Sequence, residues 1–463
     1  DGVNCIPADL CIAFSHLHVL PSRPLVKYLQ PKWLHNMATT RVSELMAREE
    51  ANTDFECLAP VNKAFHTAVA YFEDGPNTKR LQRHREKIDL YLWLGPQGLS
   101  CNGTNGVQVW DTAFTVQAAA MSGIADLPQF RDTLNRAHQY LEQSQLTTEL
   151  NDPFRQRRKG GWPFSTKSNG YIVSDCAAEG LKAVLMLQKE QYVSRIRRNT
   201  QANRGSAYPE LISDSRLKDC VDTLLTMQNS NGGFASYEMS RGSEYLELLN
   251  PAEVFDKIMV EYAYCECTSA VMSALLLFQI HFPSYRTKEI ETVTRTARQF
   301  IYKDQRPDGC WYGSWAICFN YATFLTLQAL EVAGDQYHNN KKIRKACEFL
   351  LSKQLDDGGW GEHHSSCGTG EYVSLETGQA VGTAWAVLAL MHAGYPDPVP
   401  IQRGLQFIES RQQPNGEWLQ EALEGVFNRT CMIGYPNYKF YFPIMALGSY
   451  SKHYLPKLDA LQK

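Results

Sequence analysis

From about residue 88 to the C-terminus, hydrophobic residues recur every three to four positions, a spacing that predicts amphipathic helices. Few stretches alternate in the way that half-buried strands require. Residues 1–85 are also helix-like, but six prolines interrupt their pattern. In the regular part, the predicted helices cover residues 111–121, 134–145, 179–187, 217–227, 267–280, 292–302, 322–333, 343–351, 378–393 and 399–409. The pattern therefore predicts an all-α protein.

A short motif recurs after these helices, consisting of a Gln, three residues, a Gly, one residue and an aromatic residue. It begins at Gln156, Gln228, Gln305, Gln354 and Gln412 and ends at Trp162, Phe234, Trp311, Trp360 and Trp418. Successive motifs lie 72, 77, 49 and 58 residues apart, which suits one helix pair per repeat with insertions between pairs. We expect the Gly to end a helix in the left-handed conformation, which costs other residues about 1 kcal/mol. The Gln and the aromatic residue are expected to tie neighbouring helix ends together, so that the helix pairs close into a toroid or barrel.

Composition narrows the class of protein. The chain has 463 residues, of which 44% are hydrophobic, so it can bury a large globular core. A formal net charge of −3 and the lack of a recognisable motif argue against nucleic acid as a partner. The 13 cysteines are odd in number and scattered, which predicts reduced thiols in a cytosol-facing protein. We find no signal-peptide pattern and no apolar run of the roughly 20 residues that a membrane-spanning helix needs.

One insertion between helix pairs, around residues 188–209, carries four arginines and predicts a surface loop. A solvated basic loop is the common interpretation, and binding to lipid or to a partner protein is the alternative. His16 and His18, and His363 and His364 with Cys367, lack the partners of a tetrahedral metal site at a recognised spacing. We therefore interpret these histidines as loop residues and predict no metal site.

The most distinctive acidic residue is Asp175, in the stretch Asp175-Cys176-Ala177-Ala178-Glu179 that opens the helix predicted at 179–187. Taken alone, an Asp at this place would most simply cap the helix. Together with the five repeats, the stretch resembles the acid motif of the oxidosqualene cyclases, close to the fungal lanosterol-synthase type. That motif is usually Asp-Cys-Thr-Ala-Glu or Asp-Cys-Thr-Ser-Glu, and Ala177 stands where Thr is expected.

Three further blocks resemble the same family, and the resemblance covers about residue 55 to the C-terminus. They are residues 103–106 (Gly-Thr-Asn-Gly) before Trp110, residues 266–270 (Glu-Cys-Thr-Ser-Ala) and residues 425–428 (Gly-Val-Phe-Asn). The resemblance implies an α6/α6 barrel with QW-type repeats for residues 86–463, the catalytic domain, with the insertion around 188–209. It implies that residues 1–85 are the remnant of a second, partial α-barrel domain. Cyclases of this family are longer, with a second barrel that supplies more of the cavity wall.

The resemblance also implies a reaction: an isomerase-class cyclisation of (3S)-2,3-oxidosqualene to a tetracycle, most simply lanosterol, without cofactor or metal. Asp175 is the implied general acid, with Cys176 and Cys267 as its hydrogen-bond partners. Burial keeps a carboxyl protonated, and donors to its carboxylate form restore its acidity. Thiols are weak donors that can orient the proton without abolishing that acidity.

Aromatic faces hold a cation by roughly 0.5–2 kcal/mol each without forming a bond to it. By resemblance, the cation-lining residues are Trp110, Phe164, Tyr237, Trp315 and Phe427. Tyr435 and Tyr438 are weaker candidates that could shape the final deprotonation, and Val173 is expected to shape the pocket beside the acid. For any single aromatic residue, core packing is the common alternative.

The resemblance implies a lipid substrate and a monotopic position on one membrane leaflet, facing the cytosol at the endoplasmic reticulum or on lipid droplets. The region 10–29 is our candidate for the docking segment; oligomeric state is not readable. Several alternatives stay open, among them a truncated, inactive homologue and a protostadienol-type cyclase. A squalene-hopene-type cyclase would favour Asp-x-Asp-Asp, against Ala177 and Ala178, and a prenyltransferase β-subunit would need a zinc site that the sequence does not supply.

Overall fold

The computed structural model describes residues 31–95, 98–101, 106–150, 152, 155–189, 208–250, 256–427 and 429–461. These residues form two compact units. The first comprises the described parts of 1–106, 168–170 and 241–260; the second, the barrel unit, comprises those of 107–167, 171–240 and 261–463. The boundary predicted after residue 85 lies within the first unit, and as a statement about domains it stays a prediction. His16, His18, the region 10–29, Asn428 and most of the insertion around 188–209 lie outside the described residues.

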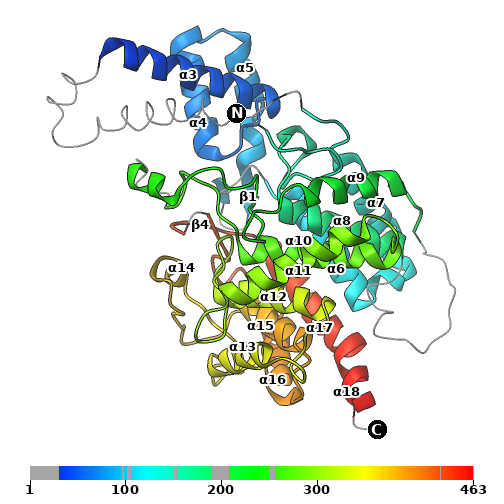
Figure 1. Ribbon diagram of the computed structural model, residues 1–463. Helices are drawn as coiled ribbons and strands as arrows, with labels where there is room; N and C mark the ends of the chain where they lie inside the picture. The colour runs from blue at the N-terminus through cyan, green and yellow to red at the C-terminus, as the bar shows by residue number, and fades with distance from the viewer. Residues whose placement is uncertain are drawn as a thin grey trace. The chain divides into compact units, whose positions relative to one another are not determined.

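Six helices of the barrel unit form an inner ring (Figure 1). Each packs against the next in chain order, and the last packs against the first, so the ring is closed. Three of them, α8, α12 and α15, are buried around their whole circumference, as expected for helices with no face toward solvent. The ring consists of α6 (Gln108–Ser122), α8 (Ser174–Gln188), α10 (Cys265–His281), α12 (Phe319–Val332), α15 (Ala380–His392) and α17 (Tyr438–Ser449).

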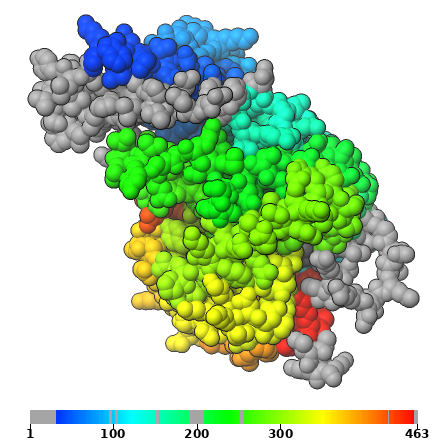
Figure 2. Space-filling view, viewed as in Figure 1, coloured from blue at the N-terminus to red at the C-terminus, as the bar shows by residue number. Residues whose placement is uncertain are grey.

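An outer helix follows each inner helix and packs against it. The outer helices are amphipathic: α11 buries Ile290, Thr294, Ala297 and Ile301, which lie three or four positions apart. In the space-filling view, green-to-yellow segments that include α11 and α13 cover this side of the unit (Figure 2). The outer layer consists of α7 (Arg131–Ser144), α9 (Asp214–Leu225), α11 (Thr287–Asp304), α13 (Lys341–Ser352), α16 (Pro398–Ser410) and, after α17, η8 (Tyr450–Tyr454) with α18 (Leu455–Leu461). The predicted all-α fold and α6/α6 barrel are confirmed.

Short elements complete the barrel unit. An antiparallel ribbon joins β3 (Gly425–Phe427) to β4 (Cys431–Ile433), with Val426 opposite Met432. The remaining pieces are η4 (Ile124–Asp126), η5 (Pro128–Phe130) and α14 (Ser365–Thr369); η6 (Lys167–Asn169) has its first residue in this unit and the other two in the first unit. None of the described helices combines the length and apolarity needed to cross a bilayer.

The first unit is built from one long helix, several short helices and one ribbon. That residues 1–85 are the remnant of a second α-barrel domain stays a prediction. The elements are α3 (Lys32–Asn52), α4 (Pro60–Val69), η2 (Ala70–Asp74), α5 (Lys79–Glu86), η3 (Ile88–Tyr91), the antiparallel strands β1 (Leu92–Gly95) and β2 (Gly98–Cys101), and η7 (Glu244–Leu249).

The repeated motif links successive outer helices from α7 to α16 around the ring. In four repeats the Trp indole Nε1 donates to a carbonyl of the outer helix that precedes it, at 2.7–2.9 Å. In the second to fourth repeats the Gln side chain donates to the motif's Gly carbonyl and to a carbonyl of the following outer helix, as Gln354 does to Gly358 (2.8 Å) and Pro400 (2.8 Å). In the last repeat, Gln412 donates to Gly416 O at 3.0 Å. The glycines have φ between +87° and +106°, so the predicted left-handed conformation is confirmed. Their predicted place at the helix end is wrong, because Thr226, Lys353 and Arg411 end the helices in the right-handed conformation and the Gly lies in the turn that follows.

The first repeat was assigned to the wrong Gln. Gln145, not Gln156, donates to the carbonyls of Gly160 (2.7 Å) and Arg216 (3.1 Å). Gln156 instead donates to the Thr226 hydroxyl at 3.1 Å. The reason is that this repeat has extra residues between Gln145 and Gly160. The N–H of Leu146 donates to Gly161 O, and the N–H of Gly160 donates to Leu146 O, so the two ends of the motif stay together while the extra residues form a loop.

One inner helix escaped the sequence prediction. α17 has Pro443 in its interior, and a proline there removes a backbone donor and normally ends a helix. The tertiary setting maintains the helix, since Tyr438, Tyr441, Phe442 and Met445 are buried in the ring.

Candidate active site

The N-terminal ends of the inner helices gather at one end of the barrel. Each outer helix returns the chain, so the inner helices run in the same direction. Asp175 and Cys176 lie in the first turn of α8, Cys267 in the first turn of α10, and Trp110 in the first turn of α6. Tyr438 is the first residue of α17. The helix dipoles therefore place partial positive charge at this end.

Asp175 is inside the helix rather than its cap. α8 begins at Ser174, and the residue before it, Val173, makes no side-chain cap. Asp175 Oδ1 accepts a hydrogen bond from the backbone N–H of Cys176 at 2.8 Å. The start of the helix is held by Ser174, whose hydroxyl donates to Ala235 O at 2.6 Å and whose N–H donates to Ser236 O at 2.8 Å. The capping interpretation of Asp175 is therefore wrong.

Two thiols meet the Asp175 carboxyl. The pKa of Asp175 is raised to about 6, mainly by burial and in smaller part by the nearby charge of Glu179. Hydrogen bonds from the Cys176 N–H, the Cys176 thiol and the Cys267 thiol act in the opposite direction on that pKa. Burial raises the pKa of both thiols well above the ordinary range, so they remain protonated donors. Ser236 Oγ lies 3.5 Å from Cys267 Sγ. The Asp175 carboxyl is therefore neutral at mildly acidic pH, and the two thiols can donate hydrogen bonds to the carboxylate that forms when it loses its proton.

One helical turn beyond Asp175, α8 carries a buried ion pair. Lys182 Nζ lies 2.8 Å from Glu179 Oε1, and neither side chain is more than 2% exposed. Gln117 on α6 donates to Glu179 Oε2 at 2.7 Å, and Lys182 donates to Gln328 Oε1 on α12 at 3.3 Å. The polar centre of the ring thus joins three inner helices.

Four of the nominated aromatic residues form one cluster. The Tyr435 and Tyr438 rings stack at 4.5 Å, and Trp110 Nε1 donates to the Tyr438 hydroxyl at 3.0 Å. Phe164 lies between, with ring centroids 5.7 Å from Trp110 and 6.4 Å from Tyr435. Trp110, Tyr435 and Tyr438 are buried, whereas Phe164 is half-buried. Phe164 is therefore the most accessible ring of this cluster.

The remaining nominated aromatics form two pairs. Trp315 and Phe427 have ring centroids 5.4 Å apart, and Tyr237 packs edge-on against Tyr171 at 6.4 Å. Trp315, Phe427 and Tyr237 are half-buried, so each offers part of a ring face. Val173 is buried two residues before Asp175, and its N–H points to Trp162 O at 3.4 Å.

Three further aromatic residues belong to this region and were not predicted. Trp385 packs edge-on against Tyr438 at 5.9 Å and against Tyr321 at 5.1 Å. Tyr264 packs edge-on against Trp315 at 5.9 Å. Tyr321 and Trp385 lie on inner helices outside any repeated motif, so only the knowledge that α12 and α15 line the ring could have singled them out.

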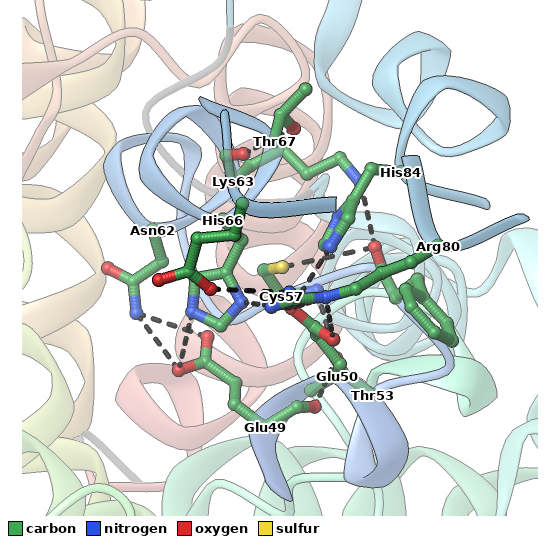
Figure 3. A network of polar contacts seen from close by, with 12 residues as sticks. Glu49, Glu50, Thr53, Cys57, Asn62, Lys63, His66, Thr67, Arg80 and His84 are labelled. Atoms are coloured by element: carbon green, nitrogen blue, oxygen red, sulfur yellow. Dashed lines mark hydrogen bonds and ion pairs between the residues drawn. The ribbon is translucent and has the colours of Figure 1, made fainter. Parts of the chain in front are cut away.

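A second polar cluster lies in the first unit (Figure 3). Its centre is Glu50, whose Oε1 is 3.2 Å from His66 Nδ1 and 3.1 Å from His84 Nε2. Among the described residues, the two groups of ligand atoms close enough for a metal ion are Glu50 with His66 and His84, and Glu49 with Cys57 and His66. Spacings of about 3 Å are compatible with a tetrahedral zinc site.

Arg80 already contacts the carboxylate that would bind a metal, and Lys63 contacts the ring nitrogen of His84 that does not face Glu50. Arg80 donates two hydrogen bonds to the Glu50 carboxylate, from Nε (2.9 Å) and from Nη2 (2.6 Å), and Lys63 Nζ lies 3.2 Å from His84 Nδ1. Burial comes first among the causes that set the pKa of Glu50, but the bonds from His66, His84 and Arg80 outweigh it and hold that pKa well below its usual range. The carboxylate is thus balanced by Arg80, and we interpret the cluster as a structural network.

Known proteins resemble this chain over most of its length. Residues 107–452 match the family model of the squalene-hopene cyclase C-terminal domain. The lanosterol synthase of Pneumocystis carinii is 49% identical over 426 residues, which are 91% of this chain and 57% of that protein. The lanosterol synthase of Saccharomyces cerevisiae is 43% identical, covering 92% of this chain and 58% of that protein. A terpene cyclase/mutase of a Nectria species is 43% identical, with 93% and 57% covered.

The chain spans a little more than half the length of these curated relatives. Among solved structures, the ent-copalyl diphosphate synthase from Streptomyces platensis is similar in fold, with a TM-score of 0.50, 15% sequence identity, and 81% of this chain and 55% of that chain covered. The family match extends over most of the barrel unit, including Asp175 and all five repeats. The chain therefore belongs to the oxidosqualene and squalene-hopene cyclase family, and it contains that family's C-terminal domain.

Proposed function

We propose that this chain forms the acid-bearing part of an oxidosqualene cyclase, an isomerase-class enzyme that converts (3S)-2,3-oxidosqualene to lanosterol. The observation that carries the proposal is Asp175, buried at the N-terminal end of the inner ring with two protonated thiols on its carboxyl. Lanosterol synthases among the relatives, at 43–49% identity, support this substrate and product.

The first step is a proton transfer from the Asp175 carboxyl to the epoxide oxygen. The C–O bond to the more substituted carbon breaks, the oxygen becomes a hydroxyl, and positive charge develops on that carbon. Cys176 and Cys267 stabilise the carboxylate that remains, because both thiols hydrogen-bond it. Burial favours the protonated acid before the step, and the thiols favour the carboxylate after it.

The cation then passes along the polyene as each double bond closes a ring, until a proton is lost. Phe164, Tyr237, Trp315 and Phe427 are half-buried, so their faces can attract the moving charge without forming bonds to it. Tyr435 and Tyr438 stack behind this wall and would hold its shape near the end of the cascade. We assign no cofactor and no metal ion a role in this chemistry.

The substrate is a membrane lipid, so we further propose monotopic docking on one leaflet at the endoplasmic reticulum or on lipid droplets, facing the cytosol. Exposed apolar side chains in the first unit support a contact with an apolar surface. They include Trp33 (65% exposed), Phe72 (83%), Leu94 (84%) and Leu99 (68%).

Product analysis tests the proposal. The chain is expressed in cells that lack their own cyclase, alone and together with the N-terminal half of a relative, and triterpenes are identified by gas chromatography–mass spectrometry. We expect lanosterol, and its loss in Asp175→Asn, because the amide cannot donate the proton. A different tetracycle would correct the product but keep the acid.

The matched control is Asp126→Asn, since Asp126 is an exposed carboxyl of the same unit. This variant should form the wild-type product at the wild-type level. Lack of any triterpene from the wild type in both settings, with the protein folded, would identify an inactive homologue and refute the proposal.

A further inference from the structure

Glu266 anchors the loop that carries Trp315. It lies in the first turn of α10, beside Cys267, and is only 1% exposed. Its Oε1 accepts the backbone N–H of Ser314 at 2.5 Å and that of Trp315 at 3.0 Å. Its Oε2 accepts the Cys265 thiol at 3.3 Å, and the same thiol also lies 3.2 Å from Tyr312 O. A carboxylate that accepts two backbone N–H bonds fixes the position of that backbone.

The anchored loop in turn holds the strand that carries Phe427. The carbonyl of Trp315 accepts the N–H of Val426 at 3.3 Å, and the N–H of Ile317 donates to Glu424 O at 2.8 Å. Phe427 follows directly in β3, and its ring centroid lies 5.4 Å from that of Trp315. One carboxylate therefore connects the helix of the acid's partner Cys267 to two of the candidate cation-lining rings.

The Trp315 ring has no polar anchor of its own among the described residues. Its indole Nε1 is buried without a hydrogen-bond partner there. The ring touches Tyr264 at 5.9 Å and Phe427 at 5.4 Å between centroids, and such aromatic contacts tolerate sliding. The backbone bonds to Glu266 are thus the directional restraint on this ring.

The same arrangement recurs at other candidate lining residues. Glu261 Oε1 accepts the N–H of Tyr237 at 3.1 Å, and Glu424 Oε2 accepts that of Tyr435 at 3.4 Å. Glu362 has the same form but holds the start of α12, four residues beyond Trp315. It accepts the N–H groups of Phe319 (3.0 Å) and Asn320 (3.2 Å) at the start of α12, where no nominated lining residue is held.

We propose that Glu266 is a positioning residue for the cyclisation, which holds Trp315, and through it Phe427, at the place where the cation passes. The inference rests on the proposed function for its reaction, but the anchoring of Trp315 is testable without it. A cation–ring attraction falls off when the ring moves from the charge, so a displaced Trp315 would let the cascade stop early.

The anchoring is measured on the full chain labelled with 5-fluorotryptophan, by ¹⁹F NMR. The Trp315 signal is assigned as the one missing in Trp315→Phe. We expect Glu266→Asp to shift or broaden this signal, because the shorter side chain keeps the carboxyl group but no longer reaches the loop. Glu266→Gln should leave the signal in place, because its amide oxygen can still accept both N–H bonds. The matched control Glu362→Asp should also leave it in place.

An unchanged Trp315 signal in a folded Glu266→Asp variant would overturn the proposal. Signals of the buried repeat tryptophans report whether each variant is folded, and Glu266→Gln supplies a variant in which the acceptor is kept. A shift in Glu266→Gln as large as in Glu266→Asp would also overturn it, since the effect would then follow the charge and not the reach.

The second arm measures products in the co-expression system described above. We expect Glu266→Asp to raise the share of incompletely cyclised products by at least threefold, while Glu266→Gln and Glu362→Asp keep the wild-type distribution. A displaced Trp315 signal with an unchanged product distribution would refute the positioning role. A wild type that forms no triterpene refutes the proposed function instead, and the ¹⁹F measurement still decides whether Glu266 anchors the loop.

Discussion

Burial keeps the Asp175 carboxyl protonated, so that it can act as an acid, and it also destabilises the folded protein once that carboxyl is charged. Withdrawal from water raises its pKa to about 6, while hydrogen bonds from Cys176 and Cys267 limit the rise. Its carboxyl is therefore neutral in mildly acidic solution and becomes charged, inside an apolar ring, as the pH rises. A group selected for proton donation in this setting is expected to cost stability at neutral pH.

The stability of Asp175→Asn tests that cost. A folded-state pKa raised above the unfolded value of about 3.9 contributes stability that is fully present below pH 4 and is lost as the pH rises through 6. The amide has no such loss. We therefore expect the variant's free energy of unfolding, relative to wild type, to increase by about 2–3 kcal/mol between pH 4 and pH 7.

Urea denaturation followed by circular dichroism at several pH values measures this difference. Asp126→Asn is the control and should show a flat difference, because Asp126 is exposed in both states. A flat difference for Asp175→Asn as well would mean that the folded protein does not raise the pKa of this carboxyl.

At the scale of the element, the repeated turn is a connector between outer helices. Gln228, Gln305 and Gln354 each bond the motif's own Gly carbonyl and a carbonyl of the following outer helix. The Gly has to be a Gly for two reasons: its φ is positive, and a Cβ on Gly358 would lie 2.8 Å from Arg403 O of the next helix. The turn thus sets how closely consecutive helix pairs pack.

Separate replacement of Gln145 and Gln156 tests which of these two glutamines belongs to the first repeat. Gln145→Ala removes bonds to Gly160 O and Arg216 O and leaves buried carbonyls unpaired, so we expect a loss of about 1–3 kcal/mol in the free energy of unfolding. Gln156→Ala removes one bond to the Thr226 hydroxyl and should cost less than about 1 kcal/mol. Chemical denaturation of both variants under one condition compares them directly, and equal losses would contradict the assignment of Gln145.

For the whole molecule, the decisive feature is closure of the inner ring. α17 returns to α6, so Trp110 meets Tyr438 across more than 300 residues of chain. At the centre, Glu179 and Lys182 on α8 contact Gln117 of α6 and Gln328 of α12. Lys182 is the one Lys or Arg that is buried among the described residues of the barrel unit. Its loss would leave a charge without a partner in the middle of the ring.

Lys182→Met is therefore expected to destabilise the protein by about 3–5 kcal/mol, because a buried carboxylate then lacks its ion-pair partner. The double variant Lys182→Met, Glu179→Leu should recover most of that loss, since replacing both charges removes the cost of burying them. Thermal and urea unfolding of the single and double variants form a mutant cycle. A double variant as unstable as the single one would show that packing, and not charge, is what Lys182 supplies.

The sequence alone determined where most of the helices and repeated turns of this protein lie along the chain. Periodicity located ten of the inner and outer helices, because amphipathic stripes are a local property, and the repeated Gly predicted the left-handed conformation that the structure contains. The family motif around Asp175 pointed to the acid before any geometry was known.

Only the tertiary structure decided which residues share the site. α17 forms despite Pro443 because the ring buries it; Gln145 replaces Gln156 because a loop intervenes; and Tyr321, Trp385 and Glu266 matter through neighbours distant in sequence. Contacts of this kind depend on which helices face inward and on how the ring closes, and a local pattern of polar and apolar residues contains no record of either.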